Sequence, residues 1–167
     1  MLPVAAGEPA RSHVVTYRGD VRLVSVSLFL ALTALLAPAP SAVARTAADF
    51  ESAVHAATNL ARVDHDLGKL RKKSCVDRFA NRQAKKMAAQ GEMFHQDLEP
   101  IMDKCGLTLV GENVAQGFTK AGTLLKAWMD SPGHRANILD ARYRQLGVGA
   151  RKSDEGTWYV AQVFGRK

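Results

Sequence analysis

The sequence predicts an α+β fold in which helices cover a small antiparallel sheet. Apolar residues spaced three and four positions apart, the period of a helix, dominate the chain up to about residue 104. Alternation with period two, typical of strands, appears only later, once near the middle of the chain and twice near its end. No β-α-β repeat is visible. Strands that come late and without intervening helical repeats are expected to pair antiparallel.

Residues 1–44 are predicted to be a secretory signal peptide. The stretch 23–37 is almost entirely apolar, two arginines precede it, and Ala-Val-Ala follows at 42–44. This order is typical of a cleaved signal, so we expect cleavage near Ala44 and a secreted protein, free or held at the cell envelope. The alternative is an uncleaved anchor, although a membrane span needs about 20 apolar residues. Residues 45–167 are expected to form a single domain.

The predicted helices end at residues that disfavour their continuation. Gly68, Gly91 and Gly106 follow the first three, and glycine readily adopts the left-handed conformation that closes a helix. Asp49 suits the positive N-terminal end of the first helix, and Ser74 is the expected N-cap of the second. The helices are predicted at residues 46–66, 74–90, 98–104 and 120–130.

Strands are predicted at residues 108–116, 145–151 and 157–164. The last two are joined by Ser-Asp-Glu-Gly at 153–156 and should form a hairpin. Before them, Ser131 and Pro132 favour the start of a further helix, with Ser131 as N-cap and Pro132 in the first position. His134 would then lie near the positive end of the helix dipole, which disfavours its protonation.

The chain is basic, with 23 Lys and Arg against 16 Asp and Glu and a net charge of +7. An exported basic protein attracts anionic envelope polymers and lipid head groups. Nucleic acid is not expected as a partner, because the basic residues are scattered and their one short cluster lies at 69–73. The alternative is a solvated basic face that only keeps the protein soluble.

Two cysteines, Cys75 and Cys105, are predicted to form a disulfide, since an even count in an exported chain favours pairing. Closing a loop of about 30 residues would stabilise the fold by roughly 3 to 4 kcal/mol on the chain-entropy model. The alternative, free thiols that bind a metal, has less support because neither cysteine lies in a C-x-x-C motif or near a histidine.

Three residues from separate segments could form a metal site: His95, Glu112 and His134. Two imidazoles and a carboxylate are a typical ligand set for an exposed zinc ion with an open position for water. By spacing alone, hydrogen-bonded histidines and a solvated glutamate are the alternatives. His55 and His65 lie within the first helix and are expected to be surface or helix-packing residues.

Five ordered motifs resemble the bacterial branch of the CAP superfamily, named after cysteine-rich secretory proteins, antigen 5 and pathogenesis-related proteins and also known by its SCP domain. The likeness covers about residues 50–164, and Asn-Leu-Ala-Arg at 59–62 resembles the first helix of that family. The motifs are Phe-His-Gln (94–96), Gly-Glu-Asn-Val-Ala-Gln-Gly (111–117), Ala-Trp-Met-Asp-Ser-Pro-Gly-His-Arg-Ala-Asn-Ile-Leu (127–139), Leu-Gly-Val-Gly-Ala (146–150) and Trp-Tyr-Val-Ala-Gln-Val-Phe-Gly (158–165).

The resemblance implies a three-layer α-β-α sandwich with a small antiparallel sheet. It also implies a cleft lined by two histidines and two glutamates, whose histidines bind zinc or another divalent cation in some members. By motif these are His95, His134 and Glu112. The second glutamate usually stands three positions after a tryptophan, where this chain has Ser131. The nearest acid is Asp130, so the expected cleft is lined by His95, Glu112, Asp130 and His134, with the two histidines as metal ligands.

Without a complete second acid, the expected function is binding rather than catalysis. The cleft would hold a divalent metal such as zinc and a small polar or lipid ligand. The first alternative is a metal-assisted, peptidase-like hydrolase in which Glu112 acts as general base. The second is a basic protein that binds anionic envelope material without any cleft chemistry.

Overall fold

The computed structural model of the protein describes residues 46–167. The predicted signal peptide at 1–44 and its cleavage site near Ala44 lie outside the described residues. Within residues 46–167, no helix is both long and apolar enough to cross a membrane.

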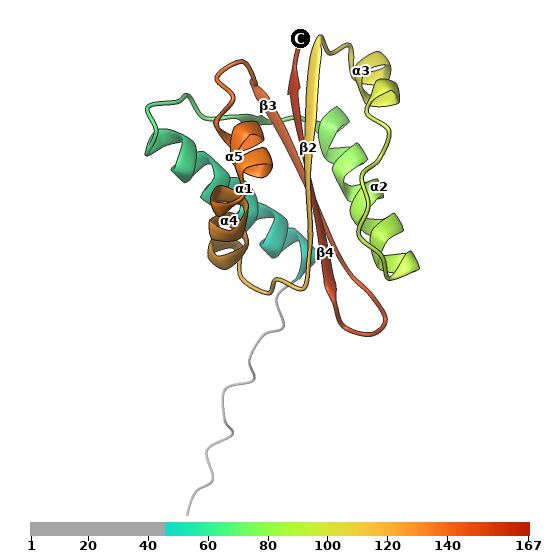
Figure 1. Cartoon of the computed structure of the whole chain (residues 1–167). Helices are drawn as coiled ribbons and strands as arrows, with labels where there is room; N and C mark the ends of the chain where they lie inside the picture. Colours follow the sequence, from blue (N-terminus) through green and yellow to red (C-terminus); the bar gives the residue numbers. More distant parts are fainter. Residues whose placement is uncertain (1–45) are drawn as a thin grey trace, which may run out of the picture. The chain divides into compact units, whose positions relative to one another are not determined.

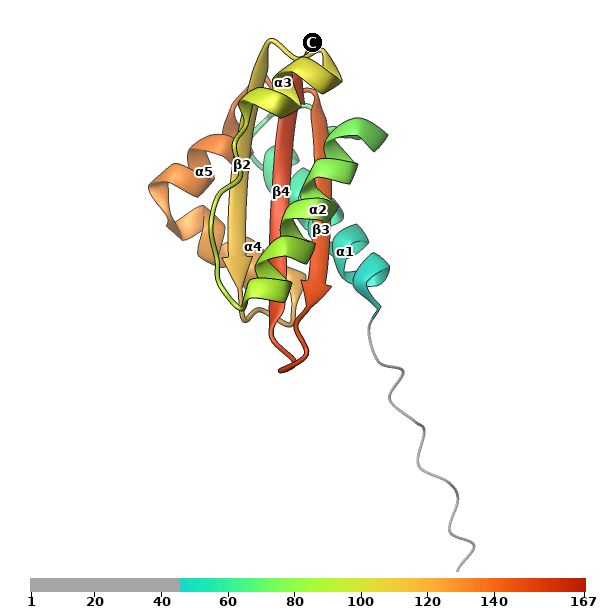
Figure 2. The same cartoon turned by 90° about the vertical axis from the view of Figure 1, so that its right-hand side faces the viewer.

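The chain folds into three layers, with a four-stranded sheet between two layers of helices (Figure 1). Helices α1, α4 and α5 cover one face, and α2 and α3 cover the other (Figure 2). The predicted α-β-α sandwich is therefore confirmed. The helices are α1 (Ala47–Val63), α2 (Ser74–Gln90), α3 (Glu99–Cys105), α4 (Ala121–Asp130) and α5 (Pro132–Leu139), and the strands are β1 (Arg71–Lys72), β2 (Leu109–Gln116), β3 (Gln145–Lys152) and β4 (Trp158–Arg166).

The strand order is β1-β3-β4-β2, so β2 forms one edge of the sheet. Strands β3 and β4 make the predicted hairpin, and β2 pairs antiparallel with β4 in a register that sets Glu112 opposite Val163. The prediction of antiparallel pairing holds for these three strands. It missed β1, a two-residue strand within the basic cluster at 69–73 that pairs parallel with the start of β3.

Each face of the sheet has its own apolar core. Phe50 and Val54 of α1 pack with Trp128 of α4 on one face, and Phe79 and Met87 of α2 pack on the other. The residues that α2 buries are those of the helical period predicted from the sequence. Burying these side chains removes apolar surface from water, which is the main favourable term in the folding of such a domain.

Helix α2 lies directly on β3 because two strand positions carry no side chain. A Cβ atom at Gly147 would meet the backbone of Val76, and one at Gly149 would meet the backbone of Ala80. The Gly-Val-Gly stretch therefore lets the helix and strand backbones approach more closely than any other residue would allow.

The ends of the helices agree in part with the predictions. Thr46 and Asp49 form a capping box at the start of α1, and Gly91 and Gly106 close α2 and α3 with φ values of 68° and 59°. The prediction for Ser74 was wrong: α2 already includes it, and the N-cap is Lys73, which makes no side-chain capping bond.

The predicted disulfide between Cys75 and Cys105 is present. It joins the first turn of α2 to the last residue of α3.

Candidate functional site

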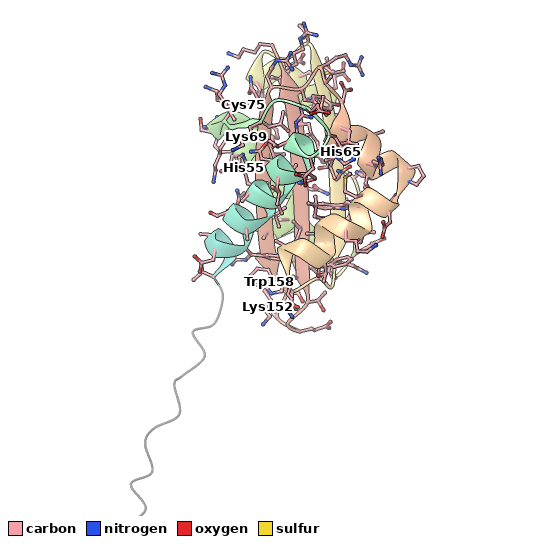
Figure 3. The ribbon with its side chains drawn as sticks, turned by 90° about the vertical axis from the view of Figure 1, so that its left-hand side faces the viewer. His55, His65, Lys69, Cys75, Lys152 and Trp158 are labelled. Carbon is pink, nitrogen blue, oxygen red and sulfur yellow. A yellow bond between two sulfur atoms is a disulfide. The ribbon has the colours of Figure 1, made fainter. Side chains whose placement is uncertain are left out.

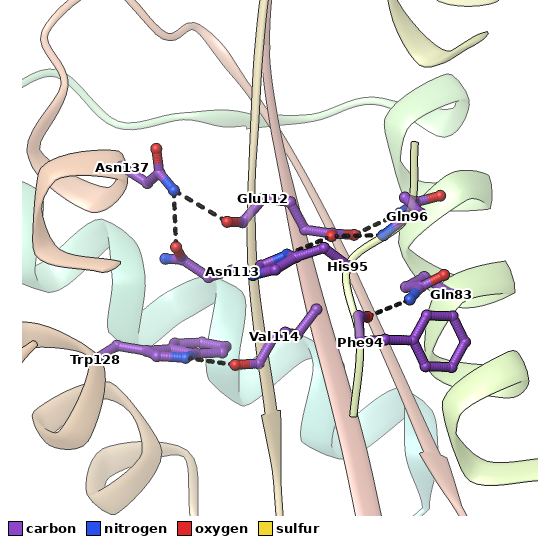
Figure 4. Close-up of polar contacts among 9 residues, drawn as sticks. All are labelled: Gln83, Phe94, His95, Gln96, Glu112, Asn113, Val114, Trp128 and Asn137. Atoms are coloured by element: carbon purple, nitrogen blue, oxygen red, sulfur yellow. Dashed lines mark hydrogen bonds and ion pairs between the residues drawn. The ribbon is translucent and has the colours of Figure 1, made fainter. Parts of the chain in front are cut away.

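Two of the predicted site residues, His95 and Glu112, contact each other along the free edge of β2 (Figure 4). Glu112 lies on β2 itself, His95 lies in the segment between α2 and α3, and His134 lies in the first turn of α5. Because α5 and α2 cover opposite faces of the sheet, the two histidines reach this edge from opposite layers.

Glu112 is enclosed and orients His95. Its side chain is only 1% exposed, whereas that of His95 is 61% exposed. One carboxylate oxygen accepts from His95 Nδ1 at 2.8 Å and from the Gln96 backbone N–H at 3.1 Å, and the other accepts from Gln96 Nε2 at 2.6 Å. His95 Nδ1 is thus engaged by the carboxylate, and its Nε2 makes no hydrogen bond to any of residues 46–167.

His134 is held in a similar way by a hydroxyl. Its Nδ1 lies 2.8 Å from Ser131 Oγ, and Nε2 has no hydrogen-bond partner among residues 46–167. Ser131 is the N-cap residue of α5 by position, but its side chain makes no bond to the helix backbone. The predicted capping role is therefore wrong for the side chain, which contacts the imidazole instead.

Burial lowers the pKa of His134, and the nearby His95 lowers it further. The sequence predicted the same direction from the helix dipole, but the structure gives removal from water as the largest cause. A lowered pKa keeps the ring neutral at neutral pH, and a neutral ring can bind a metal or accept a proton.

A buried polar network fixes the position of α5 against the sheet. Asn113 Nδ2 donates to the carbonyl of His134 at 3.2 Å and to Gln162 Oε1 at 3.2 Å. Asn137 of α5 donates to Asn113 Oδ1 at 2.9 Å and to the Glu112 carbonyl at 3.0 Å. Since Glu112 and Asn113 are neighbours on β2, their side chains reach opposite layers, and one dipeptide positions both histidines.

Asp130 does not belong to the site. Its carboxylate pairs with Lys126 Nζ at 2.6 Å, one helical turn earlier, and its side chain is 63% exposed. The expectation that Asp130 lines the cleft is corrected here: Asp130 ends α4 on its solvent side, while Trp128, two positions earlier, is buried. Among residues 46–167, Asp130 therefore does not supply a second acid beside His134.

A small apolar hollow of about 230 Å³ adjoins His134. Trp128 forms part of its wall and is fixed by a hydrogen bond from Nε1 to the Val114 carbonyl at 3.3 Å. The hollow is smaller than the roughly 300–1,000 Å³ of pockets for drug-sized ligands, so it suits part of a molecule. Its lining residues are Met93, Val114, Ala115, Gln116, Phe118, Ala127, Trp128, Ser131 and His134.

The donor set fits a divalent cation only in part. Within residues 46–167 no three His, Cys, Asp or Glu side chains are arranged to hold a metal, and tightly bound zinc takes at least three protein ligands. His95 and His134 each have Nδ1 engaged and Nε2 free, while Glu112 supports His95 from behind. The two histidines alone are therefore fewer than the protein ligands that a tightly held zinc ion needs.

The fold and the site together define the class, an α-β-α sandwich domain with His95 held by a strand glutamate and His134 beside an apolar hollow. The model of the cysteine-rich secretory protein family, CAP, matches residues 55–164, and the chain belongs to this family.

Similar proteins agree with this assignment. The Bacillus subtilis protein YkwD is 30% identical over 135 residues, which cover 77% of this chain and 50% of that protein. This chain thus spans half the length of that relative.

Two solved structures share the fold. A cysteine-rich secretory protein of Staphylococcus aureus has a TM-score of 0.64 and 23% identity over 74% of this chain and 40% of its own. An extracellular SCP-domain protein of Bacillus anthracis has a TM-score of 0.62 and 24% identity, over 74% of this chain and 45% of its own.

Sequence reasoning missed several residues that build the site. Gln96, which encloses the Glu112 carboxylate, stands next to His95 in the Phe-His-Gln motif, and Asn113 follows Glu112 directly. A polar side chain within a buried strand was the available signal, because such a group must find a partner. The partner itself, on α5 or β4, could not be read from the pattern.

Proposed function

We propose that this CAP-domain protein is exported and binds a small amphipathic ligand, with no catalytic step. The ligand would place an apolar segment in the hollow beside Trp128 and a polar group at His134 and His95. The observation that carries the proposal is that His134, whose lowered pKa favours a neutral ring, forms part of the wall of the apolar hollow. Apolar walls with a few fixed polar groups are the usual composition of small-molecule sites.

A divalent cation such as zinc would share this site. His95 and His134 would bind it through Nε2, since Glu112 and Ser131 hold the Nδ1 atoms. Bound zinc would supply a positive charge for a polar or anionic head group. Glu112 and Ser131 would keep the two rings oriented for binding the ion.

Export is supported by the disulfide and by the relatives that are described as secretory or extracellular. Disulfides persist outside the reducing cytosol. Mass spectrometry of protein recovered from culture medium tests this part. A mature chain that begins near residue 45 is expected, and a chain found only inside cells would contradict export.

Ligand binding can be tested with dodecanoate as the probe. Ala127→Glu places a charged side chain at the exposed wall of the hollow and should weaken binding about tenfold, because an apolar ligand segment would have to remove water from that carboxylate. Thr123→Glu adds the same charge one turn earlier on α4, away from the hollow, and should leave binding unchanged. Equal affinities of both variants and wild type in calorimetry would overturn the proposed ligand site.

Metal binding is tested separately by zinc titration. His95→Ala and His134→Ala should each reduce zinc uptake, whereas His65→Ala, which removes an exposed histidine of the segment after α1, should not. Zinc uptake that is the same in all four proteins would count against the metal.

A second candidate function is hydrolysis, favoured by the pairing of an enclosed carboxylate with an exposed imidazole. In that case His95, held by Glu112, would take a proton from water at the cleft. The predicted role of Glu112 itself as general base is less suitable, because its side chain is only 1% exposed. A screen with peptide, ester and glycan substrates, using His95→Gln and Glu112→Gln, decides this: activity lost in both variants would establish the enzyme.

A further inference from the structure

A second, larger hollow lies at the end of the domain that carries the disulfide, away from the histidine cleft. Figure 3 shows Cys75 toward this end and Trp158 and Lys152 at the other. The hollow has a volume of about 610 Å³ and forms where β1 and β3 begin, α2 starts and α3 ends. Its lining residues are Arg71, Lys73, Ser74, Cys75, Arg78, Lys104, Cys105, Arg144, Gln145 and Lys167.

The lining is strongly cationic and contains no acidic residue. Within the part of the chain that the structure describes, the ion pairs involve other residues, such as Lys72 with Asp77 and Arg142 with Asp140. Five cations are therefore gathered without a carboxylate partner, and they come from β1, its flank, α2, α3 and the segment before β3. Lys167 also lines the hollow. Like charges held together in a concave surface concentrate a positive field in it.

Two structural features hold these cations in place. The Cys75–Cys105 disulfide joins the start of α2 to the end of α3, which keeps Lys104 close to the residues around Lys73. The second feature is the alternation of side chains along the short strand β1. Arg71 and Lys73 line the hollow, whereas Lys72 between them pairs with Asp77. These features fix the backbone positions of the cations, which lowers the entropy lost when their side chains converge on a ligand.

The start of α2 adds to the field. The N-cap Lys73 makes no side-chain bond to the first turn of this 17-residue helix, so the free N–H groups and the positive end of the dipole face the same region as the cations. Backbone N–H groups and guanidinium forks are both well suited to phosphate oxygens.

We propose that this hollow binds a stretch of a phosphate polymer that carries no bases, engaging two or more phosphate groups at a time. The volume exceeds the need of a single phosphate. The lining contains no aromatic side chain on which a nucleobase could stack. The exposed large apolar residues Leu60, Val63 and Met93 lie elsewhere, so the hollow lacks the apolar anchor of a membrane-binding surface. This proposal is independent of the histidine cleft.

Fluorescence anisotropy with a labelled short-chain inorganic polyphosphate tests the proposal. The variant Lys73→Gln/Lys104→Gln should weaken binding about tenfold and make the dependence of log affinity on log salt shallower by roughly two units. Neither lysine makes a side-chain hydrogen bond in the described chain, so the fold should persist. The matched control is Lys85→Gln/Lys86→Gln, which removes the same charge from exposed positions further along α2 and should change affinity less than about twofold.

Equal weakening by the two double variants would overturn the site, because binding would then follow net charge alone. Affinity for polyphosphate no higher than for orthophosphate would also overturn it. Binding to single-stranded DNA, or to phosphatidylglycerol vesicles at matched phosphate concentration, that is tighter than binding to polyphosphate would contradict the proposal that the ligand is a phosphate polymer without bases. Polyphosphate binding that persists in His95→Ala/His134→Ala and with added chelator would support a site separate from the cleft, and its loss there would count against the hollow.

Discussion

Ser131 Oγ lies 2.8 Å from His134 Nδ1 and makes no bond to the backbone of the helix that it precedes. Replacing an N-cap serine with alanine usually costs about 1 kcal/mol. Because this hydroxyl contacts the imidazole, the cost of Ser131→Ala in urea unfolding should come from the lost bond to His134 and should be smaller in a His134→Ala background. Ser131→Ala should also weaken zinc uptake, since the ring of His134 loses its orientation. A loss of the same size in both backgrounds, with unchanged zinc uptake, would show that the hydroxyl caps the helix.

The folded domain should become less stable as the pH decreases below 6.5, the ordinary pKa of histidine. The pKa of His134 is lowered in the folded protein, mainly by burial, and that of His55 is lowered in the same direction. As pH falls through 6.5 the unfolded chain therefore binds protons first, and the free energy of unfolding decreases until the folded-state pKa is passed. Urea unfolding at about pH 7.5 and about pH 5 measures this loss. It should be smaller in His134→Gln than in wild type, and an unchanged loss in that variant would exclude His134 as a source.

Gly149→Ala should destabilise the domain by about 1–3 kcal/mol, because the new Cβ would overlap the backbone of Ala80 in α2. The control is Gly122→Ala in α4, where a Cβ meets nothing within 4 Å and alanine is the better helix former. Thermal unfolding should show a lower Tm for the first variant and an equal or higher Tm for the second. A Gly149→Ala protein as stable as wild type would contradict the close approach of α2 to β3.

The disulfide variant Cys75→Ser/Cys105→Ser should lose roughly 3–4 kcal/mol, because the unfolded chain regains the freedom of a 30-residue loop. Denaturant unfolding of wild type with and without a reductant gives a second measure of the same difference. A loss below about 1 kcal/mol would show that the helix ends are held together without the bond. If the polyphosphate site depends on this bond, affinity for polyphosphate should fall in the same variant.

Local patterns in the sequence predicted much of the fold. Three features could be predicted without knowledge of the packing. They are the apolar period of α2, the Ser-Asp-Glu-Gly turn between β3 and β4, and the pairing of the two cysteines. Helical and strand periods mark which side of an element is apolar, and that side must be buried wherever the element packs. The histidines and Glu112 were found through ordered motifs, and the family match at residues 55–164 confirms the resemblance on which they rested.

Other features depend on where distant segments meet. Arg62 is 1% exposed and donates to the carbonyls of Gly68, Ile138 and Asp140, although arginine in a helix pattern predicts a solvent-facing residue. Asp130 faces solvent, and the cations around Cys75 converge from five segments.

By itself, then, the sequence determined the helices, the hairpin and the cysteine pair, and it indicated His95, Glu112 and His134 as candidate site residues. Only the tertiary structure decided that Ser131 contacts His134, that Glu112 is enclosed behind His95, and that a cationic hollow forms at the disulfide end. The physical reason is that periodicity and capping are local, whereas the partner of a polar side chain is set by the packing of elements far apart in the chain.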